Sequence, residues 1–243
     1  VIVLAYFVHK EPILLDDTHL HDDLWYLLLS CAFIVIASLD GKFNTWEGIV
    51  LLFIYLLYVI HQFIECRRLK STLDEKFHET EEITIEDWIK SGGLLVAGGI
   101  LLLLVAEPFV HSIEELSTEL GINLLFLALV ISPIASEMPE KISAFILTIK
   151  SLDGAEMAIA NFVGSKVQNN TILFGLMILT ASIFVGTDIP TDSDILLLLL
   201  MTLTTIVGVK VTYDMKLHPK EGIVSLILYG ISIIFVLLLN TQF

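Results

Sequence analysis

Long apolar runs separated by short polar segments recur along the chain. Each run is near or above the ~20 residues that a helix needs to cross ~30 Å of hydrocarbon. The runs are Leu24–Leu39, Gly48–Ile64, Ser91–Ala106, Ile122–Thr148, Ala158–Val185, Ile195–Val209 and Gly222–Leu239. This pattern predicts an all-α, polytopic transmembrane helix bundle with about seven spanning helices.

The first residues and the composition extend this interpretation. Val1–Val8 has the pattern of the end of one more apolar helix, and the chain does not begin with Met, so we expect further sequence upstream.

Hydrophobic residues make up 56% of the chain and charged residues 17%, with a mean hydropathy of +0.84. These values exclude a water-soluble globule, so the lipid bilayer is the expected surrounding of a multi-pass membrane protein.

The charge of the chain is concentrated between the apolar runs. The formal net charge is −15, which argues against nucleic acid as a partner and is compatible with metal cations. The acidic connecting segments are Glu11–Asp23, Asp74–Asp87, Glu107–Glu119 and Asp188–Asp194.

The distribution of basic residues predicts the orientation of the helices. The segment Glu65–Lys90 holds five of the 13 basic residues, namely Arg67, Arg68, Lys70, Lys76 and Lys90, so the positive-inside rule places it in the cytoplasm. Alternation then gives the remaining segments. Glu107–Gly121 and Gly186–Asp194 are predicted outside, and Lys150–Asp153 and Lys210–Lys220 inside. Upstream, His9–Asp23 is predicted inside and the turn with Lys42 outside, although the charges there follow the rule less clearly.

Two consecutive apolar runs contain helix breakers. Pro133 and Pro139 lie in the run Ile122–Thr148, and each proline removes a backbone donor, so a break is expected near its middle. The next run carries Gly164 and Ser165 at a comparable place. Two interrupted helices in succession, with polar groups at the interruptions, are typical of a midplane ion site in a secondary transporter.

Glu140 is the central residue of the predicted site. It lies ten residues from Lys150, which is ~15 Å along a helix and therefore near the bilayer midplane. An isolated acid there costs roughly 2.5 to 3.5 kcal/mol, so we expect it to meet a cation, a proton or a basic partner. Nearby oxygen donors suited to calcium or sodium are Ser132, Ser136, Asn161, Gln168 and Asn169. The alternative is a structural ion pair with Lys141 or Lys166.

Two stretches of the chain resemble the second alpha repeat of the cation/calcium exchanger superfamily. They are Ile134-Ala135-Ser136-Glu137-Met138-Pro139-Glu140 and Ala160-Asn161-Phe162-Val163-Gly164-Ser165-Lys166-Val167-Gln168-Asn169. The family has a Gly-Thr-Ser-x-Pro-Glu element on one helix and a Gly-Asn-x-x-Gly-Ser-Asn-x-x-Asn element on the next. Gln168 matches the Gly-Ser-x-x-Gln form of proton-coupled members.

The resemblance implies an inverted-repeat fold with broken helices at the midplane, of which this chain carries the second half. Residues 1–64 would be the last helices of a first repeat, 65–90 a charged cytoplasmic linker, and 91–243 the second five-helix repeat. The rest of the first repeat, with its own Pro-Glu helix, would precede Val1 and act as a partner within the same polypeptide. The implied metal ligands are Glu140, Ser136, Asn161, Ser165, Asn169, Glu137 and Gln168.

The chain departs from the family pattern at several positions. Ala135 and Ala160 replace the usual Thr and Gly, and Lys166 stands where the motif has Asn, which places an ammonium in or beside the predicted ion site. Glu137 adds a second acid to the same helix, and it would either join the site or neutralise Lys166.

The functional prediction is a secondary active antiporter in a prokaryotic plasma membrane. It would exchange a metal cation, calcium foremost, for sodium or protons, with Ca²⁺ and Na⁺ or H⁺ as transported ions and no covalently bound cofactor. The motifs of hydrolases and phosphate-binding loops are absent from the sequence, so we do not expect an enzyme. A cation channel or passive pore and a non-transporting truncated membrane protein are the alternatives.

Overall fold

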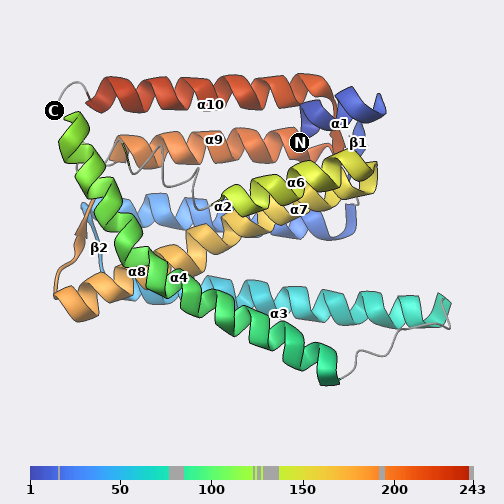
Figure 1. Ribbon diagram of the computed structural model, residues 1–243, viewed down its shortest axis with the longest axis horizontal. Helices are drawn as coiled ribbons and strands as arrows, with labels where there is room; N and C mark the ends of the chain where they lie inside the picture. The colour runs from blue at the N-terminus through green and yellow to red at the C-terminus, as the bar shows by residue number, and fades with distance from the viewer. Residues whose placement is uncertain are drawn as a thin grey trace. The chain divides into compact units, whose positions relative to one another are not determined.

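The computed structural model describes residues 1–15, 17–76, 85–122, 124, 127, 137–191 and 195–240. The chain forms two compact units. The first contains Val1–Glu65 and Pro139–Val236, and the second contains Cys66–Met138 and Leu237–Phe243. The described part is dominated by helices (Figure 1).

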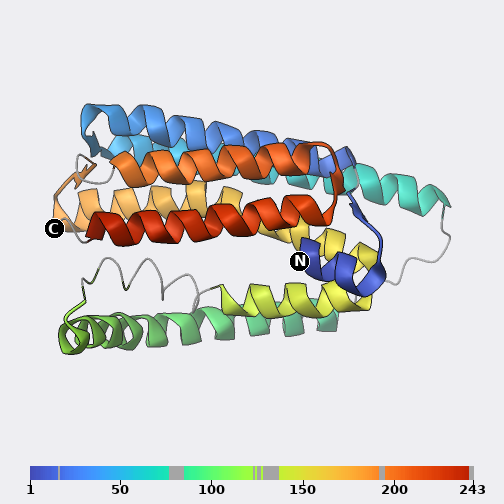
Figure 2. The same ribbon diagram turned by 90° about the horizontal axis from the view of Figure 1, so that it is seen from above.

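Most helices of the first unit coincide with predicted apolar runs, although their ends differ. They are α1 (Ile2–His9), α2 (Asp17–Ala37), α3 (Thr45–Lys76), α6 (Met138–Lys150), α7 (Leu152–Gln168), α8 (Phe174–Thr180), α9 (Ile195–Tyr213) and α10 (Pro219–Asn240). Both α3 and α10 continue into the second unit. Helix α2 packs against α7 and α9, and Figure 2 shows α2 and α9 running alongside each other.

Four described helical segments are long and apolar enough to cross a membrane, which confirms the predicted all-α transmembrane class. They are Leu20–Asp40, Thr45–Arg68, Ile89–Leu120 and Leu152–Val185, and a shorter apolar helix covers Leu198–Tyr213. The predicted run Gly222–Leu239 lies within α10, and part of the run Ile122–Thr148 lies outside the described residues. Large apolar side chains of these helices are exposed, for example Leu95 at 78% and Leu103 at 78%, as expected for lipid contact.

Three segments predicted as connections are partly helical. Helix α2 begins at Asp17 rather than near Leu24, and α3 continues to Lys76. In the second unit, α4 (Ile85–Leu120) continues through Pro108 and includes most of the predicted outside loop. The predicted limits were wrong because they followed hydropathy, whereas a helix continues into polar surroundings as long as its backbone hydrogen bonds are made.

The helix that carries the Asn-Gly-Ser motif is irregular at a different place from the one predicted. Helix α7 continues through Gly164 and Ser165 without a break, because neither residue removes a backbone donor as proline does. A π-helical segment, η2 (Asn169–Leu173), follows directly, and a second one, η3 (Ala181–Val185), follows α8. Such wide turns within α-helices are frequent at functional sites.

The helices α6 and α7 form a tight hairpin. Pro139 lies in the first turn of α6, where a missing N–H breaks no helical hydrogen bond. Ser151 caps α7 by accepting a hydrogen bond from the Gly154 N–H at 2.9 Å. Gly154 allows the Leu147 carbonyl group to lie close to the start of α7. A Cβ at residue 154 would lie 2.9 Å from the Leu147 carbonyl carbon and still closer to its oxygen.

Two short antiparallel strand pairs join loops that the sequence predicts on the same side of the membrane. Strand β1 (Ile13–Leu14) pairs with β4 (Lys216–Leu217), and both belong to segments predicted inside. Strand β2 (Lys42–Phe43) pairs with β3 (Ile189–Pro190), and both belong to segments predicted outside. Figure 1 shows β1 and β2 at opposite ends of α2. Each strand pair therefore joins two segments on the same predicted side, which is consistent with the predicted alternation of inside and outside segments along the chain.

This arrangement makes the membrane orientation testable with single cysteines at the exposed residues Lys42 and Lys216. A Lys42→Cys variant is expected to react with an impermeant maleimide added outside intact cells, and Lys216→Cys only after permeabilisation. Both are made with Cys66→Ser, because Cys66 is exposed whereas Cys31 is buried. Labelling of both positions from one side contradicts the assignment.

Candidate functional site

A small polar cavity of about 280 Å³ lies in the first unit, between α2, α3, α6 and α7. Most of its lining side chains are polar. They are Asp23, Tyr58, Gln62, Glu140, Ala160, Asn161, Gly164, Ser165 and Gln168. The cavity is the candidate functional site, because it combines two carboxylates with hydroxyl and amide groups in a membrane-spanning region.

Glu140 lies in the first turn of α6 and is half-buried. The Ser165 hydroxyl of α7 donates a hydrogen bond to Glu140 Oε1 at 3.2 Å. The α6–α7 hairpin brings these two residues together, since the chain reverses at Ser151, about midway between them. The carboxylate predicted to be at the ion site therefore faces the residue of α7 expected to accompany it.

One face of α7 forms the opposite wall of the cavity. Asn161, Gly164, Ser165 and Gln168 follow the spacing i, i+3, i+4 and i+7, which puts them on one side of a helix. Gly164 lets α3 approach this face, because a Cβ at that position would lie 3.3 Å from the Tyr58 hydroxyl. The absence of a side chain at residue 164 therefore allows the Tyr58 hydroxyl to lie close to this face of α7.

The third wall, from α2 and α3, was not predicted from the sequence. Asp23 of α2 is only 8% exposed and accepts a hydrogen bond from Gln62 Nε2. The Tyr58 hydroxyl interacts with Asp23 and with Gln62 as well. Tyr58 and Gln62 are four residues apart on α3, a spacing that puts two polar groups on one helix face and could have indicated this wall.

Four of the seven predicted ligands line the polar cavity, namely Glu140, Asn161, Ser165 and Gln168. Asn169 begins the π-helical segment and is not among the described residues that line the cavity. Glu137 belongs to the second unit, where it is partly buried, and Ser136 lies outside the described residues, as does Ser132.

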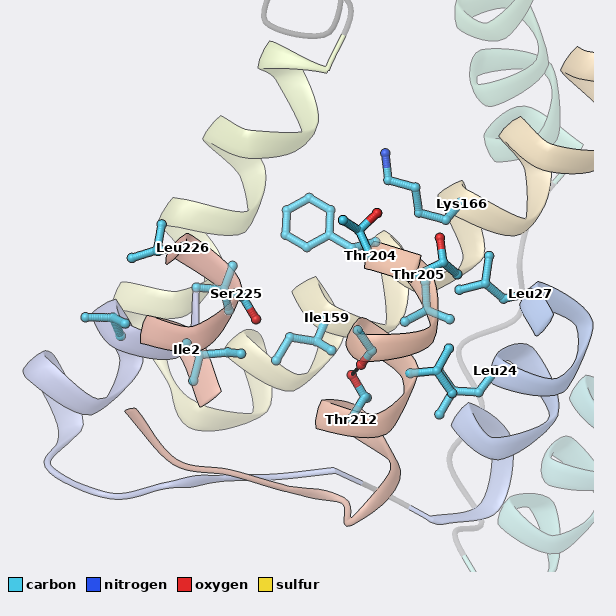
Figure 3. Close-up of a pocket in the computed structure, with 17 residues that line it drawn as sticks. Ile2, Leu24, Leu27, Ile159, Lys166, Thr204, Thr205, Thr212, Ser225 and Leu226 are labelled. Carbon is cyan, nitrogen blue, oxygen red and sulfur yellow. Dashed lines mark hydrogen bonds between the residues drawn. The ribbon is translucent and has the colours of Figure 1, made fainter. Parts of the chain in front are cut away.

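Lys166 lines a different cavity from that of Glu140. This second cavity, of about 530 Å³, is lined mainly by apolar residues together with threonines of α9. Figure 3 shows Lys166 beside Thr204 and Thr205. Adjacent helical residues are rotated by about 100°, so Ser165 and Lys166 present their side chains to different neighbours. Lys141, the other suggested partner of Glu140, is exposed on α6.

The donors of the polar cavity suit a hard cation. Carboxylate, amide and hydroxyl oxygens are the ligands that calcium and sodium prefer, whereas zinc and its relatives select His and Cys. Among the described residues, there is no group of three or more His, Cys, Asp or Glu side chains positioned for a metal ion. A cation here would therefore be held by few carboxylates, completed by neutral oxygens.

Comparisons with known proteins agree on one family. A family model described as sodium/calcium exchanger protein matches residues 2–64 and 90–238. The vacuolar cation/proton exchanger 3 of Arabidopsis thaliana is 26% identical over 143 residues, which cover 56% of this chain and 31% of that protein. The chain thus spans about a third of the length of this relative.

Solved exchanger structures share the fold. The H⁺/Ca²⁺ exchanger CAX superposes with a TM-score of 0.73 at 22% identity, over 99% of this chain and 65% of that one. The sodium-calcium exchanger NCX_Mj superposes with a TM-score of 0.58 at 22% identity, over 95% of this chain and 70% of that one. The chain therefore shares the helical fold of these exchangers.

Proposed function

Because the chain belongs to the sodium/calcium exchanger family, we propose that it acts as a secondary active antiporter that exchanges a metal cation, calcium foremost, for protons or sodium ions. The observation that carries the proposal is the polar cavity in which Glu140 and Ser165 meet across the α6–α7 hairpin. The cations are substrates of the site and no further cofactor is required.

The proposed chemistry follows from the charge on Glu140. A carboxylate in the membrane interior is stabilised when a cation or a proton neutralises it, and it is unfavourable when neither is present. Because the same oxygen cannot hold both, the cation and the counter-ion compete for one group, which couples their movements. The Ser165 hydroxyl and the amide oxygens of Asn161 and Gln168 would replace part of the hydration shell of the cation.

Protons are the favoured counter-ion of the proposal. Gln168 lines the cavity, and it stands where proton-coupled members of the family have the Gln of their Gly-Ser-x-x-Gln form. The plant relative is a cation/proton exchanger by name. A titratable carboxylate is also the simplest acceptor for a transported proton. Sodium coupling is the alternative within the same proposal.

The remaining predicted ligands and boundaries belong to this proposal. Ser136, Glu137 and Asn169 would complete the second-repeat ligands, together with a Pro-Glu helix from a first repeat. Residues 1–64, 65–90 and 91–243 would be the end of that first repeat, the linker and the second repeat. A prokaryotic plasma membrane is the proposed location of the integral membrane protein.

The test is calcium uptake by proteoliposomes that contain the complete polypeptide. Uptake of radioactive calcium is expected to saturate and to require an outward gradient of protons, with a smaller or no response to a sodium gradient. A channel or passive pore would instead give calcium flux without any counter-ion gradient. Absence of flux and of calcium binding would leave the non-transporting alternative.

A further inference from the structure

Asp23 differs from Glu47, the other strongly buried acid among the residues of the first unit that the structure describes. Glu47 is 1% exposed and accepts a hydrogen bond from the Asn44 N–H at 2.6 Å, so its carboxylate caps the start of α3. Asp23 lies in the second turn of α2 and lines the polar cavity. The role of Glu47 is therefore explained by the helix that it caps, whereas the position of Asp23 points to the cavity.

Asp23 and Glu140 approach the cavity from different helices. Glu140 comes from α6, next to Ser165, and Asp23 comes from α2, where Gln62 donates to it. Both belong to the same compact unit and to the lining of the same cavity of about 280 Å³. Two ionised carboxylates that line so small a space repel each other, and a divalent cation between them would neutralise both.

We propose that Asp23 is a second carboxylate of the cation site, so that a divalent cation binds between Asp23 and Glu140. This inference rests on the proposed function and adds a residue from α2 that no family motif supplies. A divalent ion would match two carboxylates in charge, and carboxylate oxygens are ligands that calcium prefers.

The experiment measures calcium binding to the complete, purified polypeptide by titration calorimetry. The Asp23→Asn variant is expected to bind calcium at least about tenfold more weakly. Asp23→Glu keeps the charge and is expected to recover part of the affinity. Asp22→Asn is the matched control and is expected to stay within about twofold of the wild type, because Asp22 is not among the lining residues described for the cavity.

Each other outcome contradicts the inference in a distinguishable way. Unchanged calcium affinity in Asp23→Asn would exclude Asp23 as a ligand, and a loss of affinity in Glu140→Gln under the same conditions would still support the proposed function. Weaker binding and a lower melting temperature in both Asp23→Asn and Asp23→Glu would assign Asp23 a structural role only. Absence of calcium binding by the wild type would contradict the proposed function and the inference together.

Discussion

Replacing Glu140 with Gln is expected to reduce calcium exchange in proteoliposomes of the complete polypeptide at least about 100-fold. The substitution keeps the shape of the side chain and removes its negative charge, so neither a cation nor a transported proton has its acceptor. Removing one member of a buried charge interaction typically costs about 3 to 5 kcal/mol, which exceeds the roughly 2.7 kcal/mol that corresponds to a factor of 100.

The Glu140→Gln substitution would also change the contact between this side chain and Ser165. Ser165 donates to Glu140 Oε1 at 3.2 Å, and the side-chain amide of the Glu140→Gln variant would offer that hydroxyl only one carbonyl oxygen. A Glu114→Gln variant is the control, since Glu114 is an exposed acid of α4 in the other unit. Full exchange by a folded Glu140→Gln variant would contradict the proposed function.

The Gly154→Ala variant is expected to lower the stability of the protein by about 1 to 3 kcal/mol or more, because the site cannot accommodate a methyl group without a backbone shift. Its Cβ would meet the Leu147 carbonyl group in the α6–α7 turn. Backbone atoms yield less easily than the end of a flexible side chain. The measurement is thermal unfolding of the purified protein in detergent, in which the melting temperature should fall by several degrees.

Gly208→Ala provides a matched comparison on α9. A Cβ there would meet no heavy atom within 4 Å among those that the structure describes. Replacing a helical Gly by Ala at an open position usually raises stability by about 0.4 to 1 kcal/mol. If both variants melt at the same temperature, the close approach at Gly154 does not constrain the turn.

Because this turn positions Glu140 against Ser165, we also expect Gly154→Ala to weaken calcium binding.

The helices were predictable to the extent that hydropathy marks them. Apolar runs identified α2, α3, α4, α7, α9 and α10 because lipid contact requires apolar side chains over the length of a span. Their ends were not predictable in the same way. Asp17 to Asp23 is polar in sequence yet helical, so a limit set at Leu24 left Asp23 in a loop.

The part of the cavity wall that α6 and α7 form could also be predicted from the sequence. Glu140, Asn161, Ser165 and Gln168 lie on two consecutive helices, and their spacing and short connection bring them together. Asp23 and Gln62 come from helices far away in sequence, and their position depends on how α2 and α3 pack against α7. The spacing of Tyr58 and Gln62 indicates a polar face on α3, but the sequence does not show which helix that face meets.

The two strand pairs have a mechanical consequence for any alternating access. Strand β1 precedes α2 and pairs with β4, which follows α9, whereas β2 follows α2 and pairs with β3, which precedes α9. Further hydrogen bonds strengthen both ends, from Leu15 N–H to the Met215 carbonyl and from Thr191 N–H to the Gly41 carbonyl, each at 2.9 Å. The two antiparallel helices α2 and α9 are therefore joined at both ends, and we expect them to move together. Any opening of the cavity to one side of the membrane would then come from other helices that shift relative to this pair.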